Sequence, residues 1–220
     1  QLAWLAGLVV PAAVRSALLP VLGAARHRPT HHRREMHTAM DLCVGLLPFG
    51  LFGGYLIMRI FAPLAFPTEY LDGTHGASAV DVFTVLLAGW GLTLLATPTY
   101  TSLMAGPYPW RFTLFILLVL TAAVVLGYTL IVLGPAQPGH RLYAAAVASS
   151  LSAGVLLLLS WRMSGGMDFV RERQDDWALA LLGGGFVVIG LISGTHWWLL
   201  GLPLFLFTRR GWQAVRATLD

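Results

Sequence analysis

Long apolar runs separated by short polar connections dominate this chain. Four of these runs, at residues 42–66, 82–103, 112–134 and 142–163, match the length of about 20 residues that a helix needs to cross the hydrocarbon core of a bilayer. The runs at 82–103 and 112–134 contain no charged residue. The pattern therefore predicts four transmembrane helices in the middle of the chain.

The two ends of the chain are less regular. Residues 1–25 are apolar but are interrupted by Pro11, Arg15 and Pro20, which fits either a kinked span or a helix lying on the membrane surface. A span is the favoured interpretation. Residues 177–207 are apolar but too long for one crossing, and glycines interrupt them, so we predict a short helical hairpin there.

Arginine positions set the expected orientation. Arginines gather in three segments, which the positive-inside rule places in the cytoplasm. They are Arg26, Arg28, Arg33 and Arg34, then Arg162, Arg171 and Arg173, and finally Arg209, Arg210 and Arg216. The C-terminus is therefore expected in the cytoplasm, whereas the loops at 67–81 and 135–141 are expected on the outer side.

These patterns predict an all-α fold, a polytopic transmembrane helical bundle with six or seven membrane segments and a C-terminal short helical hairpin. The whole chain, 1–220, forms a single integral membrane domain in this interpretation. Composition agrees, because 57% of the residues are hydrophobic and only 11% are charged, against about 25% charged in soluble domains.

Composition also excludes several classes of function. All 14 basic residues are arginine, so no lysine is present to form a Schiff base with retinal. Arginine-only basic residues with abundant small apolar ones are typical of a GC-rich genome, and we expect the bacterial cytoplasmic membrane. The single cysteine, Cys43, excludes an internal disulfide or a thiolate metal cluster. The net charge is +4, and the arginines that produce it lie beside apolar spans. This placement indicates contact with lipid and not with nucleic acid.

Three histidines lie in separate outer-side connections. His75, His140 and His196, together with Asp72, are candidate ligands for a divalent metal, because neutral imidazole and carboxylate suit such ions. This metal is the one cofactor that the sequence suggests. The preferred interpretation is that each histidine is an interfacial loop residue bonded to water or to the backbone.

A second group of histidines lies in the stretch His27-Arg-Pro-Thr-His31-His32. This stretch resembles one histidine box of the membrane desaturase and hydroxylase family, whose di-iron site needs several such boxes. Only one box is present, and interleaved arginines repel a metal cation. We therefore expect a solvated basic loop whose residues Arg26 to Arg34 contact anionic lipid headgroups.

Other polar residues near the spans have two interpretations each. Arg59 lies inside the run at 42–66, where it either pairs with Asp81 or binds an anion or a lipid phosphate, and the pairing is favoured. Asp41 is expected at the start of the same helix. Pro98, beside several threonines, either opens a helix towards a polar pathway or ends it at the cytoplasmic face, and the second is favoured.

The sequence favours a non-catalytic function. It contains no Walker A loop, nucleophile elbow, HExxH motif or carboxylate pair inside a span. We therefore expect a small permease, or the membrane subunit of a transport or energy-coupling complex with partner membrane or cytoplasmic subunits. One alternative is a metal-dependent enzyme or redox protein using the outer His/Asp site. Another is a membrane sensor or anchoring module, since residues 177–207 are similar to paired-helix modules of bacterial envelope-stress and sensor proteins.

Overall fold

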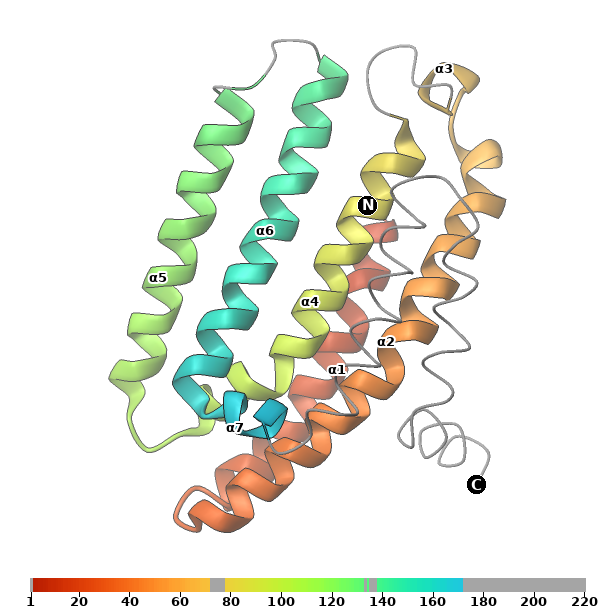
Figure 1. Ribbon diagram of the computed structural model, residues 1–220. Helices are drawn as coiled ribbons and strands as arrows, with labels where there is room; N and C mark the ends of the chain where they lie inside the picture. Colours follow the sequence, from red (N-terminus) through yellow and green to blue (C-terminus); the bar gives the residue numbers. More distant parts are fainter. Residues whose placement is uncertain (1, 72–77, 133, 135–137, 172–220) are drawn as a thin grey trace, which may run out of the picture.

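The computed structural model describes residues 2–71, 78–132, 134 and 138–171 (Figure 1). In this part of the chain every regular element is helical, which confirms the predicted all-α class for these residues. The elements are α1 (Leu2–Ala24), α2 (Pro29–Ala65), α3 (Thr68–Leu71), α4 (Ala79–Ala105), α5 (Pro109–Gly127), the π-helical turn η1 (Tyr128–Val132), α6 (Pro138–Ser164) and α7 (Gly166–Arg171). The predicted hairpin at 177–207 lies outside the described residues.

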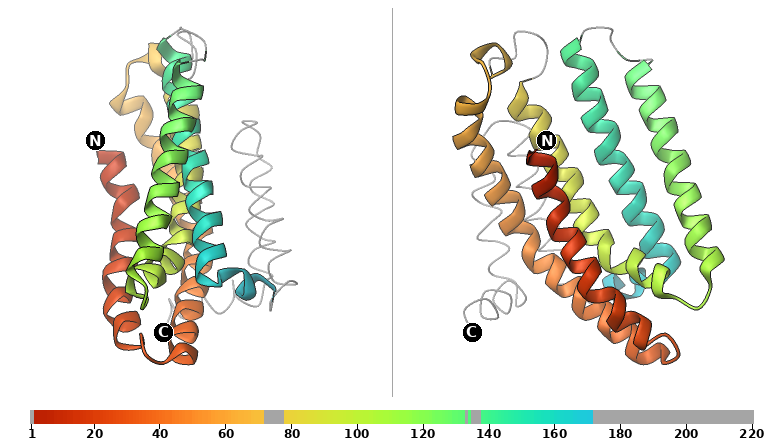
Figure 2. Two further views of the ribbon diagram at one scale, coloured as in Figure 1. Left: turned by 90° about the vertical axis from the view of Figure 1, so that its left-hand side faces the viewer. Right: turned by 180° about the vertical axis from the view of Figure 1, so that it is seen from behind.

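The long helices form an elongated bundle in which α4 is central. Helix α4 lies between α2 and α6, α1 packs on α4 from behind, and α5 lies at the outer edge beyond α6 (Figures 1 and 2). The α1–α2 turn, the α4–α5 loop and α7 meet at one end, which we call the basic end. The arginines of these segments and of the adjoining helix ends are Arg26, Arg28, Arg33, Arg34, Arg111, Arg162 and Arg171. The opposite end carries α3 and the start of α6, and we call it the α3 end.

Three helices are long and apolar enough to cross a membrane. They are Ala79–Ala105, Pro109–Val132 and His140–Ser164, which overlap the predicted spans at 82–103, 112–134 and 142–163. Shorter apolar segments lie at Val9–Ala24 in α1 and at Gly53–Ala65 in α2. The three apolar helices support an integral membrane protein.

Helix α2 begins earlier than the sequence predicted. The basic stretch around residues 29–41 is helical, not a loop, and Asp41 lies inside α2, so its predicted place at the helix start is wrong. Pro29 occupies the first turn, where its fixed φ suits a helix and its missing amide hydrogen is not needed. Met36 and Met40 are buried one turn apart, so tertiary packing keeps this polar segment helical.

Helix α4 continues through Pro98, whereas the favoured prediction ended the helix there. Pro98 lacks an amide hydrogen, so one carbonyl of the preceding turn loses its helical donor. Neighbouring threonines add side-chain hydrogen bonds to the backbone: Thr97 Oγ1 donates to Thr93 O at 2.8 Å, and Thr101 Oγ1 donates to Thr97 O at 2.6 Å. Because Pro98 is buried among α4's partners, packing favours the unbroken helix, which ends before Gly106.

Glycines bring the central helices close together. A Cβ atom at Gly89 would lie 3.0 Å from Ser150 Cα, so α4 and α6 touch through their backbones. Ser150 Oγ also donates to Val85 O of α4 at 2.6 Å. On the other side of α4, the Trp90 ring packs directly against Gly50 of α2. Small residues at such contacts are the usual basis of helix packing inside membranes.

The hydrophobic core is concentrated at the basic end. Gly165 has a φ of +78°, which favours glycine, and it turns the chain back so that α7 lies under the bundle. Phe169 of α7 is consequently 0% exposed. The buried residues of this core are Leu18, Leu22, Met36, Met40, Val44, Ala96, Leu157, Trp161 and Phe169. Five helices, α1, α2, α4, α6 and α7, therefore meet around one apolar centre.

Candidate functional site

Buried hydroxyl groups lie beside this core and form the most polar part of the bundle interior. We call them the hydroxyl cluster: Thr97, Thr99, Thr101 and Ser102 of α4 and Ser160 of α6. Each of these residues is at most 7% exposed. Both helices are candidate spans, where an unpaired polar group is costly. The hydrogen bonds of these hydroxyls therefore decide whether this region is stable.

One pair of hydroxyls joins α4 to α6. Thr99 Oγ1 lies 2.8 Å from Ser160 Oγ, and both atoms are buried. Ser160 Oγ donates to Leu157 O at 3.0 Å, so it can accept from Thr99, whose single hydroxyl hydrogen is shared with Ala96 O, also at 2.8 Å. Trp161 Nε1 donates to Leu95 O at 3.4 Å in the same interface. The contact between α4 and α6 is thus hydrogen-bonded as well as closely packed.

His32 joins α2 to two other helices. Its Nδ1 lies 3.2 Å from Leu22 O of α1, and its Nε2 lies 2.8 Å from Ser102 Oγ of α4. A carbonyl oxygen only accepts, so Nδ1 carries a hydrogen and donates to Leu22 O. In the neutral ring Nε2 then accepts the Ser102 hydroxyl hydrogen. His32 was predicted to lie in a solvated loop, although its spacing of four residues to Met36 and eight to Met40 indicates the same buried face.

The Ser102–His32 distance is also that of a nucleophile and its base. Ser102, however, lies in the last turn of α4, where the neighbouring amide hydrogens already bond to carbonyls one turn earlier in the helix. They are not available to stabilise an oxyanion, which acyl-transfer chemistry requires. His32 and Ser102 therefore form a structural hydrogen-bonded link between α1, α2 and α4.

Two contacts hold α7 against α2. Arg33 Nη2 lies 3.5 Å from Asp168 Oδ2, with side chains that are 48% and 55% exposed. The rings of His37 and Phe169 meet edge to face, with centroids 4.9 Å apart. An exposed ion pair of this kind contributes about 0–1 kcal/mol, whereas burying a phenylalanine contributes about 1.5–3 kcal/mol. Phe169 is therefore the main anchor of α7.

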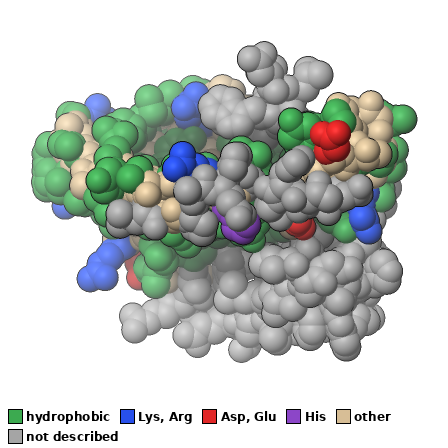
Figure 3. Space-filling model, turned by 90° about the horizontal axis from the view of Figure 1, so that it is seen from above, with side chains coloured by type: hydrophobic (Ala, Val, Ile, Leu, Met, Phe, Trp, Pro, Cys, Tyr) green, Lys and Arg blue, Asp and Glu red, His purple; other side chains and the backbone are tan. Residues whose placement is uncertain are grey.

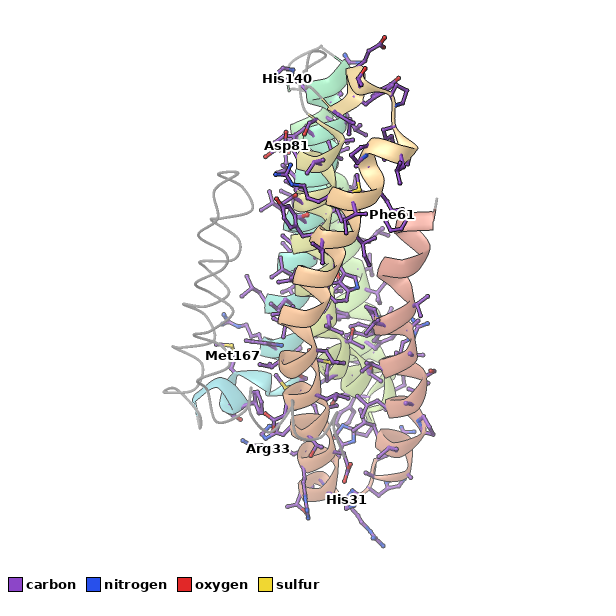
Figure 4. All side chains as sticks on the ribbon, turned by 90° about the vertical axis from the view of Figure 1, so that its right-hand side faces the viewer. His31, Arg33, Phe61, Asp81, His140 and Met167 are labelled. Atoms are coloured by element: carbon purple, nitrogen blue, oxygen red, sulfur yellow. The ribbon has the colours of Figure 1, made fainter. Side chains whose placement is uncertain are left out.

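The predicted outer metal site falls largely outside the described residues. Asp72, His75 and His196 lie there, and His140 is exposed at the start of α6 on the α3 end (Figure 4). Within the described ranges, no group of three or more His, Cys, Asp or Glu side chains could hold a metal. Figure 3 looks onto the α3 end, where acidic and basic side chains are scattered among apolar ones. Convergence of the three histidines stays a prediction.

Asp81 has a local structural role. Ser78 N donates to Asp81 Oδ2 at 3.2 Å, and Asp81 N donates to Ser78 Oγ at 3.1 Å. This capping box fixes the start of α4, and the Ser-x-x-Asp spacing is its sequence signature. Arg59 is exposed, with its Cζ 6.0 Å from the centroid of the Tyr55 ring. In the described part of the chain no ion pair joins Arg59 to Asp81, and a lipid or anion role for either residue stays a prediction.

Arginines at the basic end make specific contacts with the α4–α5 loop. Arg26 Nη2 donates to Pro107 O at 3.1 Å. Arg111 Cζ lies 5.2 Å from the ring centroid of Tyr108 and 5.7 Å from that of Trp110. These contacts place two exposed guanidinium groups beside one short loop.

The chain matches no protein-family model, no curated protein and no solved structure. Functional inference therefore rests on the side chains and helices themselves. The helices bring together buried hydroxyls and one imidazole at the basic end, which is the chemistry of hydrogen bonding to a neutral polar group or to a cation.

Proposed function

We propose that this protein is a non-catalytic integral membrane component, which works as a small permease or as the membrane subunit of a transport or energy-coupling complex. The observation that carries the proposal is that the described elements are long apolar helices with short connections, and that their buried polar side chains lie between helices. A chain of this kind acts inside the bilayer or through partner chains.

The hydroxyl cluster is the proposed polar region of the transport function. Pro98 deprives one α4 carbonyl of its helical donor, and such carbonyls with nearby hydroxyls are typical of polar pathways in membrane proteins. His32 and Ser160 connect this region to α2 and α6. Small shifts of these helices would bring the hydroxyls into contact with a solute.

The proposed topology has six or seven membrane segments with the basic end in the cytoplasm of a bacterial cell. Arginine asymmetry supports this orientation. Seven arginines of the described chain lie at the basic end and Arg15 lies within α1, whereas only Arg59 and Arg141 of the described arginines lie towards the α3 end. A cytoplasmic partner subunit would then meet α7 and the α1–α2 turn.

Helix α5 has the surface of a lipid-facing element. Only 6% of the most apolar stretch of Pro109–Val132 is buried inside the bundle, against 33% of the corresponding stretch of α4. Its exposed side chains are large and apolar, among them Leu117, Leu120 and Val124. Bulky aliphatic side chains suit lipid acyl chains, since helix–helix contacts in membranes favour small residues. The bundle therefore presents α5 to the bilayer.

Native mass spectrometry of the protein, extracted gently from its own membrane, tests the proposal. We expect partner subunits to be retained without a stoichiometric metal. A lone chain that carries one metal or haem per molecule would overturn the proposal and favour the metal-dependent enzyme. In that event, loss of the metal in a His75→Ala, His196→Ala double variant would locate the site.

A further inference from the structure

Two arginines that are far apart in the sequence each contact the α4–α5 loop. Arg26, after α1, donates to Pro107 O, and Arg111, in the first turn of α5, lies over the ring of Tyr108, the next residue of the loop. Both arginines are exposed, and neither makes an ion pair within the described part of the chain. Their positive charge is therefore available to an external anion.

We propose that Arg26 and Arg111 form a binding surface for the phosphate group of an anionic phospholipid. A guanidinium group has five N–H donors, and Arg26 uses one of them on Pro107 O. Arg111 is held over two aromatic rings, which orients the group but leaves its N–H edge free. Each guanidinium group can therefore offer N–H donors to phosphate oxygens.

The aromatic residues place this surface at the level of the headgroups. Tyr108 is 54% exposed and Trp110 is 61% exposed, and tyrosine and tryptophan concentrate at membrane–water interfaces. The candidate span Pro109–Val132 begins at the same point of the chain. Arg26 and Arg111 therefore lie where lipid phosphates lie, and not in bulk water.

The apolar surface next to Arg111 favours a lipid over a soluble phosphate. Leu114, Leu118 and Val125 follow Arg111 at helical spacing, and all three are more than 40% exposed. A phospholipid with its phosphate at Arg111 would lay an acyl chain along these side chains. Inorganic phosphate would gain nothing from them.

The test compares retention of phosphatidylglycerol and phosphatidylcholine by the full chain, using native mass spectrometry in mixed lipid. The test variant is Arg26→Gln with Arg111→Gln. The matched control is Arg15→Gln with Arg141→Gln, which removes the same charge from two exposed positions, one within α1 and one in the first turn of α6. Size-exclusion chromatography and protection of the buried Cys43 from maleimide verify folding.

We expect the test variant to lose preference for phosphatidylglycerol by roughly fivefold for each arginine removed, while the control changes by less than twofold. Arg111→Lys should keep part of the preference, because it retains the charge. Equal losses in the test and control variants, or no loss in either, would overturn the proposal.

A further variant separates the two sources of phosphate. Leu118→Ser leaves both arginines in place and should weaken phosphatidylglycerol retention, and inorganic phosphate should not displace the lipid. Displacement by inorganic phosphate, with no effect of Leu118→Ser, would show a site for a free anion and would refute the lipid assignment. None of these outcomes depends on whether the protein is a permease.

Discussion

Replacing Gly89 by alanine is expected to push α4 and α6 apart. The added Cβ would lie 2.7 Å from Ser150 Oγ and 3.0 Å from Ser150 Cα. The hydroxyl can rotate away, but it then loses its 2.6 Å hydrogen bond to Val85 O. The Cα atom belongs to the α6 backbone, so the whole helix has to move.

The size of the effect follows from three terms. Overpacking a close contact costs about 1–3 kcal/mol, and loss of the Ser150 hydrogen bond costs about 0.5–1.5 kcal/mol more. Alanine offsets this by about 1 kcal/mol, because it is a better helix former than glycine. We therefore expect Gly89→Ala to lower the free energy of unfolding by about 0.5–3.5 kcal/mol.

Unfolding in mixed detergent micelles, followed by tryptophan fluorescence and by alkylation of the buried Cys43, measures this change. Gly53→Ala is the matched control, since a Cβ there meets nothing within 4 Å. The control should unfold at the same fraction of denaturing detergent as the unaltered protein, or at a higher fraction. If Gly89→Ala is as stable as the unaltered protein, or if Gly53→Ala loses as much, the close α4–α6 contact is refuted.

The same micelle assay checks three further predictions. His32→Ala removes both hydrogen bonds that tie α2 to α1 and α4 and should cost about 1–3 kcal/mol; an unchanged midpoint would contradict the tie. Phe169→Ala should lower the free energy of unfolding by about 3–5 kcal/mol, because it empties a buried site. Asp168→Asn should lower it by only about 0–1 kcal/mol. The reverse order would show that the ion pair is the main anchor of α7. Thr99→Val should lower the free energy of unfolding by about 1–3 kcal/mol, because Ser160 loses the hydroxyl at 2.8 Å. Its control, Thr113→Val at an exposed position of α5, should change the free energy of unfolding by less than about 0.5 kcal/mol.

Three spans were predictable because each is a long apolar run between breaking residues. Proline and glycine at residues 106–109 separate α4 from α5, for example, and the helices end within a few residues of the predicted limits. The start of α2 was not predicted, because its charge and histidine content suggested a solvated loop. Its early start depends on Pro29 and on the burial of Met36 and Met40, which is a tertiary effect.

The hydroxyl cluster illustrates what the sequence could not show. The threonines around Pro98 are visible as a polar group, but their partner Ser160 is on another helix. Hydroxyls on two helices meet only when the helix register is known. His32 was assigned to the wrong environment for the same reason, since its two partners lie on α1 and α4.

The two ends of the bundle differed in how well their chemistry could be predicted. Asp81 carried a capping signature with Ser78, yet it was paired with Arg59 because an intramembrane arginine suggests a partner. Arg26 and Arg111 gave no sequence signal that they contact the same loop, because Arg26 reaches Pro107 only in the folded chain. The outer histidine site and the terminal hairpin stay predictions.

The sidedness of single cysteines in intact cells tests most directly whether the helices cross a membrane with the basic end inside. In a Cys43→Ser background, Thr30→Cys and Thr68→Cys lie near opposite ends of α2, and His140→Cys and Met167→Cys lie near opposite ends of α6. We expect a membrane-impermeant maleimide to label positions 68 and 140 in intact cells, and positions 30 and 167 only after the cells are opened. Labelling of both members of either pair from the same side would contradict the account.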